Sequence, residues 1–206
     1  INMYANLTTQ GEAIFRLSGE AMSGQQKAFY NTQCVPSDQL LNMFDADDVR
    51  LQLLRKDGEA KCLKYHATVV PDNDDKREDP IVFRLSEMYL TAAEAAWHLQ
   101  RYADARNYVK AGLQRNIGDE KATAELAKYT DAELINLIRN ERTKELCFEG
   151  HNLFDITRWK QSVVRDADTS SSVREKLYPS DYFILPIPQY ELDANENMLP
   201  NPTVNK

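Results

Sequence analysis

The sequence is poor in the residues that mark several common functional classes. Its 206 residues include only 7 glycines, 3 histidines and 3 cysteines. With so few glycines it has no phosphate-cradling loop, and no Ser or Cys stands in a nucleophile motif. The histidines, His66, His98 and His151, lack the short spacing of metal ligands. These absences predict a protein that is not an enzyme and that carries no metal or cofactor.

Cysteine pattern, charge and hydropathy exclude further classes. Cys34, Cys62 and Cys147 are odd in number and follow no short pairing pattern, so we expect free thiols or small buried hydrophobes. The net charge of -7 and the absence of a Lys/Arg run argue against nucleic acid. No apolar run is long enough to cross a bilayer. The 42% apolar content suffices for one substantial core.

Helical periodicity dominates residues 81–160. Apolar side chains recur at i, i+3 and i+4 from Leu85 onward, and a partner helix follows a break at Gln100 and Arg101. The expected stripe of the first helix is Leu85, Met88, Tyr89, Ala92, Ala93, Ala96 and Leu99. We therefore predict one helical hairpin over 81–116 and a second over 131–160.

Small residues in this hairpin suggest its architecture. Ala93, Ala105 and Gly112 have spacings similar to the small-residue positions of a tetratricopeptide unit. The predicted fold class is mainly α, with tetratricopeptide-like helical hairpins, long loops and minor short strands. We expect one domain over 1–206, made of a loop-rich segment with short strands (1–80), the hairpins (81–160) and an extended tail (161–206).

Residues 138–160 mix charge with large apolar groups in an unusual way. Thr130 and Glu133 form a capping box at the start of the helix that leads into this segment. Gly150 is the expected hinge between that helix and a second, short helix. We interpret the charged side chains as a buried ion network, because buried charges persist when they are mutually paired. The predicted members are Arg139, Glu141, Arg142, Glu145, Glu149, Asp155 and Arg158. An alternative is a catalytic acid and base pair among Glu145, Glu149 and Asp155.

The N-terminal part reads as strands, loops and one short helix. Alternation predicts strands over 13–17 and 63–67, and an apolar stripe predicts a short helix within 37–54. The acidic cluster at 45–48 fits a helix-start cap better than a calcium site, and the acidic run in the exposed loop 71–80 reads as solvated charge.

The aperiodic loop 23–36 offers a candidate ligand site. Phe29 and Tyr30 could stack on sugar faces while Asn31 binds hydroxyl groups. The alternative is that both rings anchor the loop in the core.

Three segments resemble one known family, in the expected order. RNERTKELCFEGHNLFDITRW (139–159), VFRLSEMYLTAAEAAW (82–97) and FILPIPQYELDANENMLPNP (183–202) are similar to signatures of the SusD/RagB family, the surface nutrient-binding lipoproteins of Bacteroidetes. GEAIFRLSGE (11–20) is a weaker match. The first segment is the most specific.

This resemblance implies a function and a location. Family members bind glycans or other nutrients at the outer face of the outer membrane and deliver them to a SusC-like TonB-dependent transporter, without catalysis. The chain begins at Ile1, so the resemblance implies a C-terminal half whose lipid anchor lies on a missing N-terminal part. The resemblance implies that the stretch after the first strand lies near the ligand surface, as it does in SusD-like proteins, which favours Tyr30 as a ligand contact.

Two other functions are compatible with the residues. A helical-repeat adaptor would bind a protein in a groove between the hairpins, and capture of a transporter or peptide without any sugar-dependent signal would distinguish it. A glycoside hydrolase using Glu145 and Asp155 would turn over a chromogenic glycoside and lose that activity in Glu145→Gln.

Overall fold

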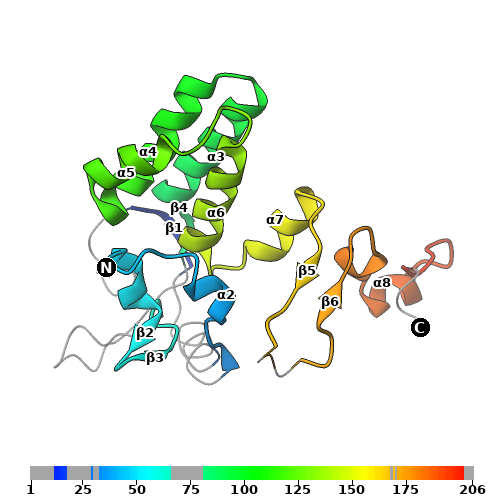
Figure 1. Ribbon diagram of the computed structural model, residues 1–206. Helices are drawn as coiled ribbons and strands as arrows, with labels where there is room; N and C mark the ends of the chain where they lie inside the picture. Colours follow the sequence, from blue (N-terminus) through cyan, green and yellow to red (C-terminus); the bar gives the residue numbers. More distant parts are fainter. Residues whose placement is uncertain are drawn as a thin grey trace. The chain divides into compact units, whose positions relative to one another are not determined.

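The computed structural model describes residues 12–17, 29, 33–65, 81–167, 169 and 171–201. The chain divides into two compact units, residues 1–150 and 151–206. Helices dominate the first unit, whereas the second combines short helices with a small hairpin (Figure 1). In the part of the chain that is described, no helix is both long and apolar enough to span a membrane.

A helical hairpin forms the centre of the first unit. Helix α3 (Leu85–His98) and helix α4 (Tyr102–Ile117) pack against each other, which confirms the hairpin predicted over 81–116. The chain reverses at Gln100, which adopts a positive φ of 59°. Ala93 and Ala105 are fully buried, so small side chains do allow close helix approach there.

The apolar stripe expected on α3 is only partly correct. Ala93 and Ala96 are buried, but Leu85, Met88, Tyr89 and Leu99 are exposed. The buried face instead includes the polar side chains of Ser86, Glu87 and Glu94. Apolar spacing alone failed here because the apolar arc of α3 is wider than the face that α4 and its neighbours cover.

Two further helices complete the core. Helix α5 (Asp119–Leu126) packs on α4, and helix α6 (Leu134–Leu146) packs on α3. The capping box is confirmed, since the Thr130 amide donates to Glu133 Oε2 (3.1 Å) and the Glu133 amide donates to Thr130 Oγ1 (3.3 Å). The shared apolar core comprises Leu90, Ala93, Ala96, Ala105, Val109, Leu113, Ala122, Leu126, Leu134, Leu137 and Ile138.

Gly118 joins α4 to α5 in a conformation that only glycine adopts readily, with φ 86° and ψ 158°. We expect Gly118→Ala to lower the free energy of unfolding by about 1–3 kcal/mol, because a Cβ strains this backbone. The control is Gly112→Ala in the middle of α4. A Cβ would meet nothing within 4 Å at either site, and only Gly118 has a positive φ.

Gly112→Ala should raise the free energy of unfolding by up to about 1 kcal/mol, because alanine favours helix. Urea unfolding followed by circular dichroism measures both changes. Equal effects of the two substitutions would contradict the role assigned to the Gly118 backbone.

Short strands and turns bring the N-terminal part to the helices. Strand β1 (Ala13–Arg16) pairs antiparallel with β4 (Ile81–Arg84), as expected for the first predicted strand. Strands β2 (Arg55–Lys56) and β3 (Glu59–Ala60) form a tight hairpin. The strand predicted over 63–67 is wrong for its described residues 63–65, which are coil and turn.

The helix predicted within 37–54 is two short elements. Helix α2 (Asp38–Leu41) is capped by Ser37, and a 3-10 helix, η1 (Val49–Leu53), is capped by Asp48, whose carboxylate accepts from the Arg50 amide. The cap interpretation of the acidic cluster is thus confirmed at Asp48. The charged turn between the elements breaks the apolar stripe and ends α2 early.

The second unit holds the rest of the described chain. Helix α7 (Asn152–Arg158) comes first, so the hairpin predicted over 131–160 resolves into α6 in one unit and α7 in the other. Strands β5 (Val163–Val164) and β6 (Glu175–Lys176) pair antiparallel. The tail, expected to be extended, also contains η2 (Asp181–Phe183) and helix α8 (Gln189–Ala194).

Candidate functional site

Glu145 is the centre of a buried charge cluster in the first unit. Its carboxylate accepts hydrogen bonds from four side chains on other elements. The donors are Arg84 Nη1 (2.5 Å) and Arg115 Nη2 (2.6 Å) to Oε1, and Arg50 Nη1 (3.2 Å) and Asn116 Nδ2 (3.3 Å) to Oε2. Only 6% of the Glu145 side chain is exposed. A carboxylate buried this far is stable only because the guanidinium groups compensate its charge.

Two neighbouring carboxylates extend the cluster. Glu149 accepts from Arg84 Nε (2.7 Å) and Lys64 Nζ (2.6 Å), and Glu141 accepts from Arg50 Nη2 (3.0 Å). Arg50 also bonds the carboxylate of Asp48 (2.6 Å from Nη2 to Oδ2). The cluster therefore fastens the segment 48–64 to helix α6.

The same cations close the end of α6. The backbone carbonyl of Glu145 accepts from Lys64 Nζ (2.7 Å) and Arg84 Nη2 (2.6 Å). The last carbonyl groups of a helix have no partner within it, and cations are favourable at the negative end of the helix dipole. The segment around Lys64 thus acts as the C-terminal cap of α6.

Pairing of strands β1 and β4 brings Arg84 and Glu12 to the charge cluster. Arg84 ends β4, and the Leu85 amide donates to the Glu12 carbonyl (2.8 Å). This register places Glu12 beside Arg115 and Ser86, whose hydroxyl donates to Glu12 Oε2 (2.7 Å). A short strand pair therefore joins the N-terminal segment to the cluster.

The cluster keeps its carboxylates ionised. Burial raises the pKa of Glu145, but the guanidinium groups of Arg84, Arg115 and Arg50 outweigh it and hold the pKa well below its usual range. Burial likewise raises the pKa of Glu149, and the charges of Lys64 and Arg84 bring it below the ordinary value. A general acid must hold a proton near neutral pH, so neither side chain suits that role.

The structure distributes the predicted network residues over separate interactions. Arg142 lies 3.6 Å from Glu87 and donates to Thr91 Oγ1 (3.2 Å). Asp155 and Arg158 pair with each other within α7 (2.9 Å), in the second unit. Arg139 is half-buried on α6.

The sequence interpretation expected arginines close in the chain to supply the positive charge. Lys144 pairs with Glu141 from one helical turn away, but the other cations at Glu141, Glu145 and Glu149 come from distant segments. The residues of those segments were missed: Asp48, Arg50, Lys64, Arg84, Arg115 and Glu12. The position of Arg84 could have indicated a buried cation, because this charged residue directly follows the apolar strand residues 81–83.

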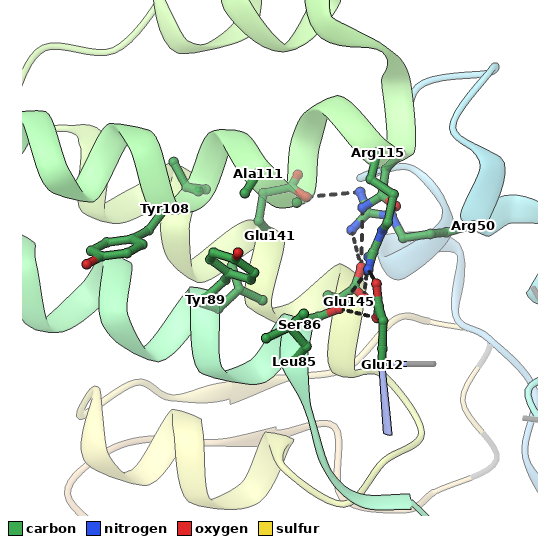
Figure 2. A pocket seen from close by; sticks show the side chains of 14 residues that line it. Glu12, Arg50, Leu85, Ser86, Tyr89, Tyr108, Ala111, Arg115, Glu141 and Glu145 are labelled. Atoms are coloured by element: carbon green, nitrogen blue, oxygen red, sulfur yellow. Dashed lines mark hydrogen bonds and ion pairs between the residues drawn. The ribbon is translucent and has the colours of Figure 1, made fainter. Parts of the chain in front are cut away.

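A pocket with a cavity volume of about 60 Å³ opens beside the cluster. Figure 2 shows Tyr89 and Tyr108 on one side of it and Arg50, Arg115, Glu12 and Glu145 on the other. The two tyrosine rings, from α3 and α4, are 6.4 Å apart between centroids and tilted by 49°. The pocket therefore has an aromatic wall, formed by Tyr89 and Tyr108, and a charged floor, formed by Glu12, Arg50, Arg115, Glu141 and Glu145.

The predicted loop site is described at one position. Phe29 is 49% exposed, so its ring is not fully packed into a core. Tyr30 and Asn31 lie outside the described residues. Within the described ranges, no group of histidine, cysteine or acidic residues is arranged to hold a metal ion.

Comparison with known proteins decides the family. The family model of the SusD family matches residues 24–203. The chain belongs to the SusD family. This confirms the resemblance found in the three sequence segments, of which 139–159 contains Glu141, Glu145 and Glu149 of the charge cluster.

Relatives of this SusD-family chain are longer than it is. It is 30% identical over 130 residues to "SusD-like protein P25" of Formosa agariphila, an alignment that covers 62% of the chain and 24% of that relative. It is similar to the crystal structure of a putative sugar-binding protein from Bacteroides vulgatus (TM-score 0.77, 28% identity), covering 97% of the chain and 48% of that protein.

A second solved structure is similar to this chain over nearly its whole length. A SusD superfamily protein from Bacteroides thetaiotaomicron has a TM-score of 0.72 and 26% identity, with 94% of the chain and 49% of that protein covered. The chain thus spans about half the length of these solved relatives. The mainly helical fold class is confirmed by this similarity.

Proposed function

We propose that the chain belongs to a cell-surface protein that binds glycans or other nutrients without catalysing a reaction. One observation carries this proposal: the SusD family model matches residues 24–203. The similarity to a putative sugar-binding protein supports a carbohydrate ligand. The lowered pKa values of Glu145 and Glu149 support binding over hydrolysis, because ionised carboxylates do not protonate a glycosidic oxygen.

In this proposal the protein hands its ligand to a SusC-like TonB-dependent transporter. Attachment to the outer face of the outer membrane would be through a lipid anchor on a part of the protein N-terminal to this chain. The binding step needs only shallow contacts, in which ring faces cover the C–H side of a sugar and amides bind its hydroxyl groups.

The loop residues Phe29, Tyr30 and Asn31 are the proposed first contacts. The half-exposed ring of Phe29 supports this assignment, since an exposed aromatic ring is available for stacking. Stacking of a nucleobase on one aromatic side chain is worth about 1–3 kcal/mol, and we take the lower part of this range as the scale for a sugar face.

We expect Phe29→Ala and Tyr30→Ala each to weaken glycan binding by about tenfold, because each removes one stacking face. A glycan array identifies the ligand, and calorimetry then measures the dissociation constant. The control is Tyr190→Ala on α8, whose ring is 69% exposed and should not affect the same ligand.

Three outcomes would contradict the proposal. They are no binding of any glycan, turnover of a chromogenic glycoside that Glu145→Gln abolishes, and capture of a transporter or peptide by a chain with no sugar-dependent signal. The last would favour the adaptor function.

A further inference from the structure

Two of the four exposed residues of the α3 stripe, Leu85 and Tyr89, line the pocket between α3 and α4. Leu85 and Tyr89 are 44% and 38% exposed, and Tyr108 across from them is 37% exposed. Among the described residues, the hydroxyl groups of Tyr89 and Tyr108 make no hydrogen bond. Apolar ring faces beside free hydroxyl groups form the kind of surface that binds sugars.

Gly112 keeps one wall of this pocket open. It lies in the middle of α4, where glycine weakens a helix relative to alanine. Neither a positive φ nor a close neighbour accounts for it, because a Cβ there would meet nothing within 4 Å. The tetratricopeptide-like spacing marks Gly112 as a small-residue position, and in the structure this position borders open pocket space.

The charged floor of the pocket is already satisfied internally. Arg115 donates from Nη1 to Ser86 (2.8 Å), from Nη2 to Glu145 (2.6 Å) and from Nε to Asn116 (3.1 Å), and it also pairs with Glu12. Its guanidinium therefore has little capacity left for an anionic ligand. Three carboxylates and two guanidinium groups line the pocket, so the floor does not attract negative charge.

We infer that the pocket between Tyr89, Tyr108 and Gly112 is a second sugar site that binds part of one neutral pyranose ring. The inference rests on the proposed glycan binding and names a location and a ligand class within it. An apolar edge of the ring enters beside Gly112, the tyrosine rings cover its C–H face, and their hydroxyl groups bond its oxygens. Tyr89 and Tyr108 lie on the same side of the pocket (Figure 2).

The size of the pocket sets the expected affinity. Its 60 Å³ holds several water molecules, whereas pockets that enclose a whole small-molecule ligand reach about 300–1,000 Å³. The site thus takes part of one ring, with the remainder of the glycan outside. A contact of this size gives a dissociation constant on the order of 1 mM.

The test uses amide chemical shifts of the chain with matched neutral and charged probes. Methyl glucoside, methyl galactoside and methyl mannoside are the neutral probes, and methyl glucuronide is the charged one. We expect at least one neutral glycoside to shift the amides of Ala111 and Gly112, and the glucuronide to bind at least tenfold more weakly.

Substitutions at the pocket separate binding from folding. Gly112→Leu fills the space and should weaken this binding by at least tenfold, whereas Ala103→Leu, at an exposed position of α4 that does not line the pocket, should leave it unchanged. Tyr108→Phe removes only the hydroxyl group and should weaken binding by about threefold. Thermal melts of each variant show whether the helix remains folded.

The outcomes distinguish this inference from the proposed function. Shifts confined to the loop around Phe29, or equal binding of the glucuronide, would overturn the inference and leave glycan binding intact. Unchanged binding in a folded Gly112→Leu variant would also overturn it. No response of any amide to any probe or to the array glycans would overturn both.

Discussion

Glu145→Ala should lower the free energy of unfolding by about 3–5 kcal/mol. The substitution leaves Arg84, Arg115 and Arg50 close together without the carboxylate that they share. Removing one partner of a buried ion pair costs this much stability because the remaining charge is buried without compensation. Urea unfolding followed by circular dichroism measures the change. Glu145→Gln should recover only part of the loss, because it keeps the shape but removes the charge.

The control for this prediction is an exposed ion pair at the N-terminal end of α4. Arg101 and Asp104 lie 2.6 Å apart, but their side chains are 63% and 41% exposed. Asp104→Ala should change the free energy of unfolding by no more than about 1 kcal/mol, because water screens the pair. A loss below 1 kcal/mol in Glu145→Ala as well would mean that the cluster is solvated.

Acid should destabilise the first unit from about pH 5 downward. Because the folded-state pKa values of Glu145 and Glu149 lie below the ordinary value of 4.5, their stabilisation is complete above that value and is lost as the pH falls. Each carboxylate adds a slope of up to about 1.4 kcal/mol per pH unit. Urea unfolding at a series of pH values between 7 and 3 tests this.

Substitution and salt provide separate checks on the acid effect. Glu149→Gln should flatten the slope below pH 5, because one titrating group is gone, although the variant starts from a lower stability. Salt at 1 M should leave most of the acid sensitivity, because buried pairs are screened much less than surface charges. A free energy of unfolding that stays constant from pH 7 to 3.5 would refute the assignment.

The sequence predicted the parts of the fold that depend on local pattern. The hairpin of α3 and α4 follows from helical spacing and a break at Gln100, and the capping box at Thr130 needs only residues three positions apart. The exposed positions of α3 could not be predicted in this way. Whether Glu87 is buried depends on Arg142, which α6 supplies from elsewhere in the chain.

The charge cluster was predicted in kind but only partly in membership. Glu145 and Glu149 stand out because each adjoins a large apolar residue, and Glu141 lies one helical turn before Glu145. Their partners did not, because Arg50 and Arg84 are single charges in unrelated segments and only tertiary packing brings them to α6. The pocket was missed for the same reason, since its two walls come from different helices.

The composition of the cluster also has a consequence for the order in which this unit folds. Glu145 meets Arg115, Arg84 and Arg50 across 30, 61 and 95 residues of chain, whereas α3 and α4 are joined by a turn of a few residues. Closing long loops costs more conformational entropy, and contacts distant in sequence slow folding. We therefore expect the helical hairpin of α3 and α4 to assemble before the cluster, whose carboxylates and guanidinium groups lose their water only when the segments around Arg50 and Arg84 pack against α6.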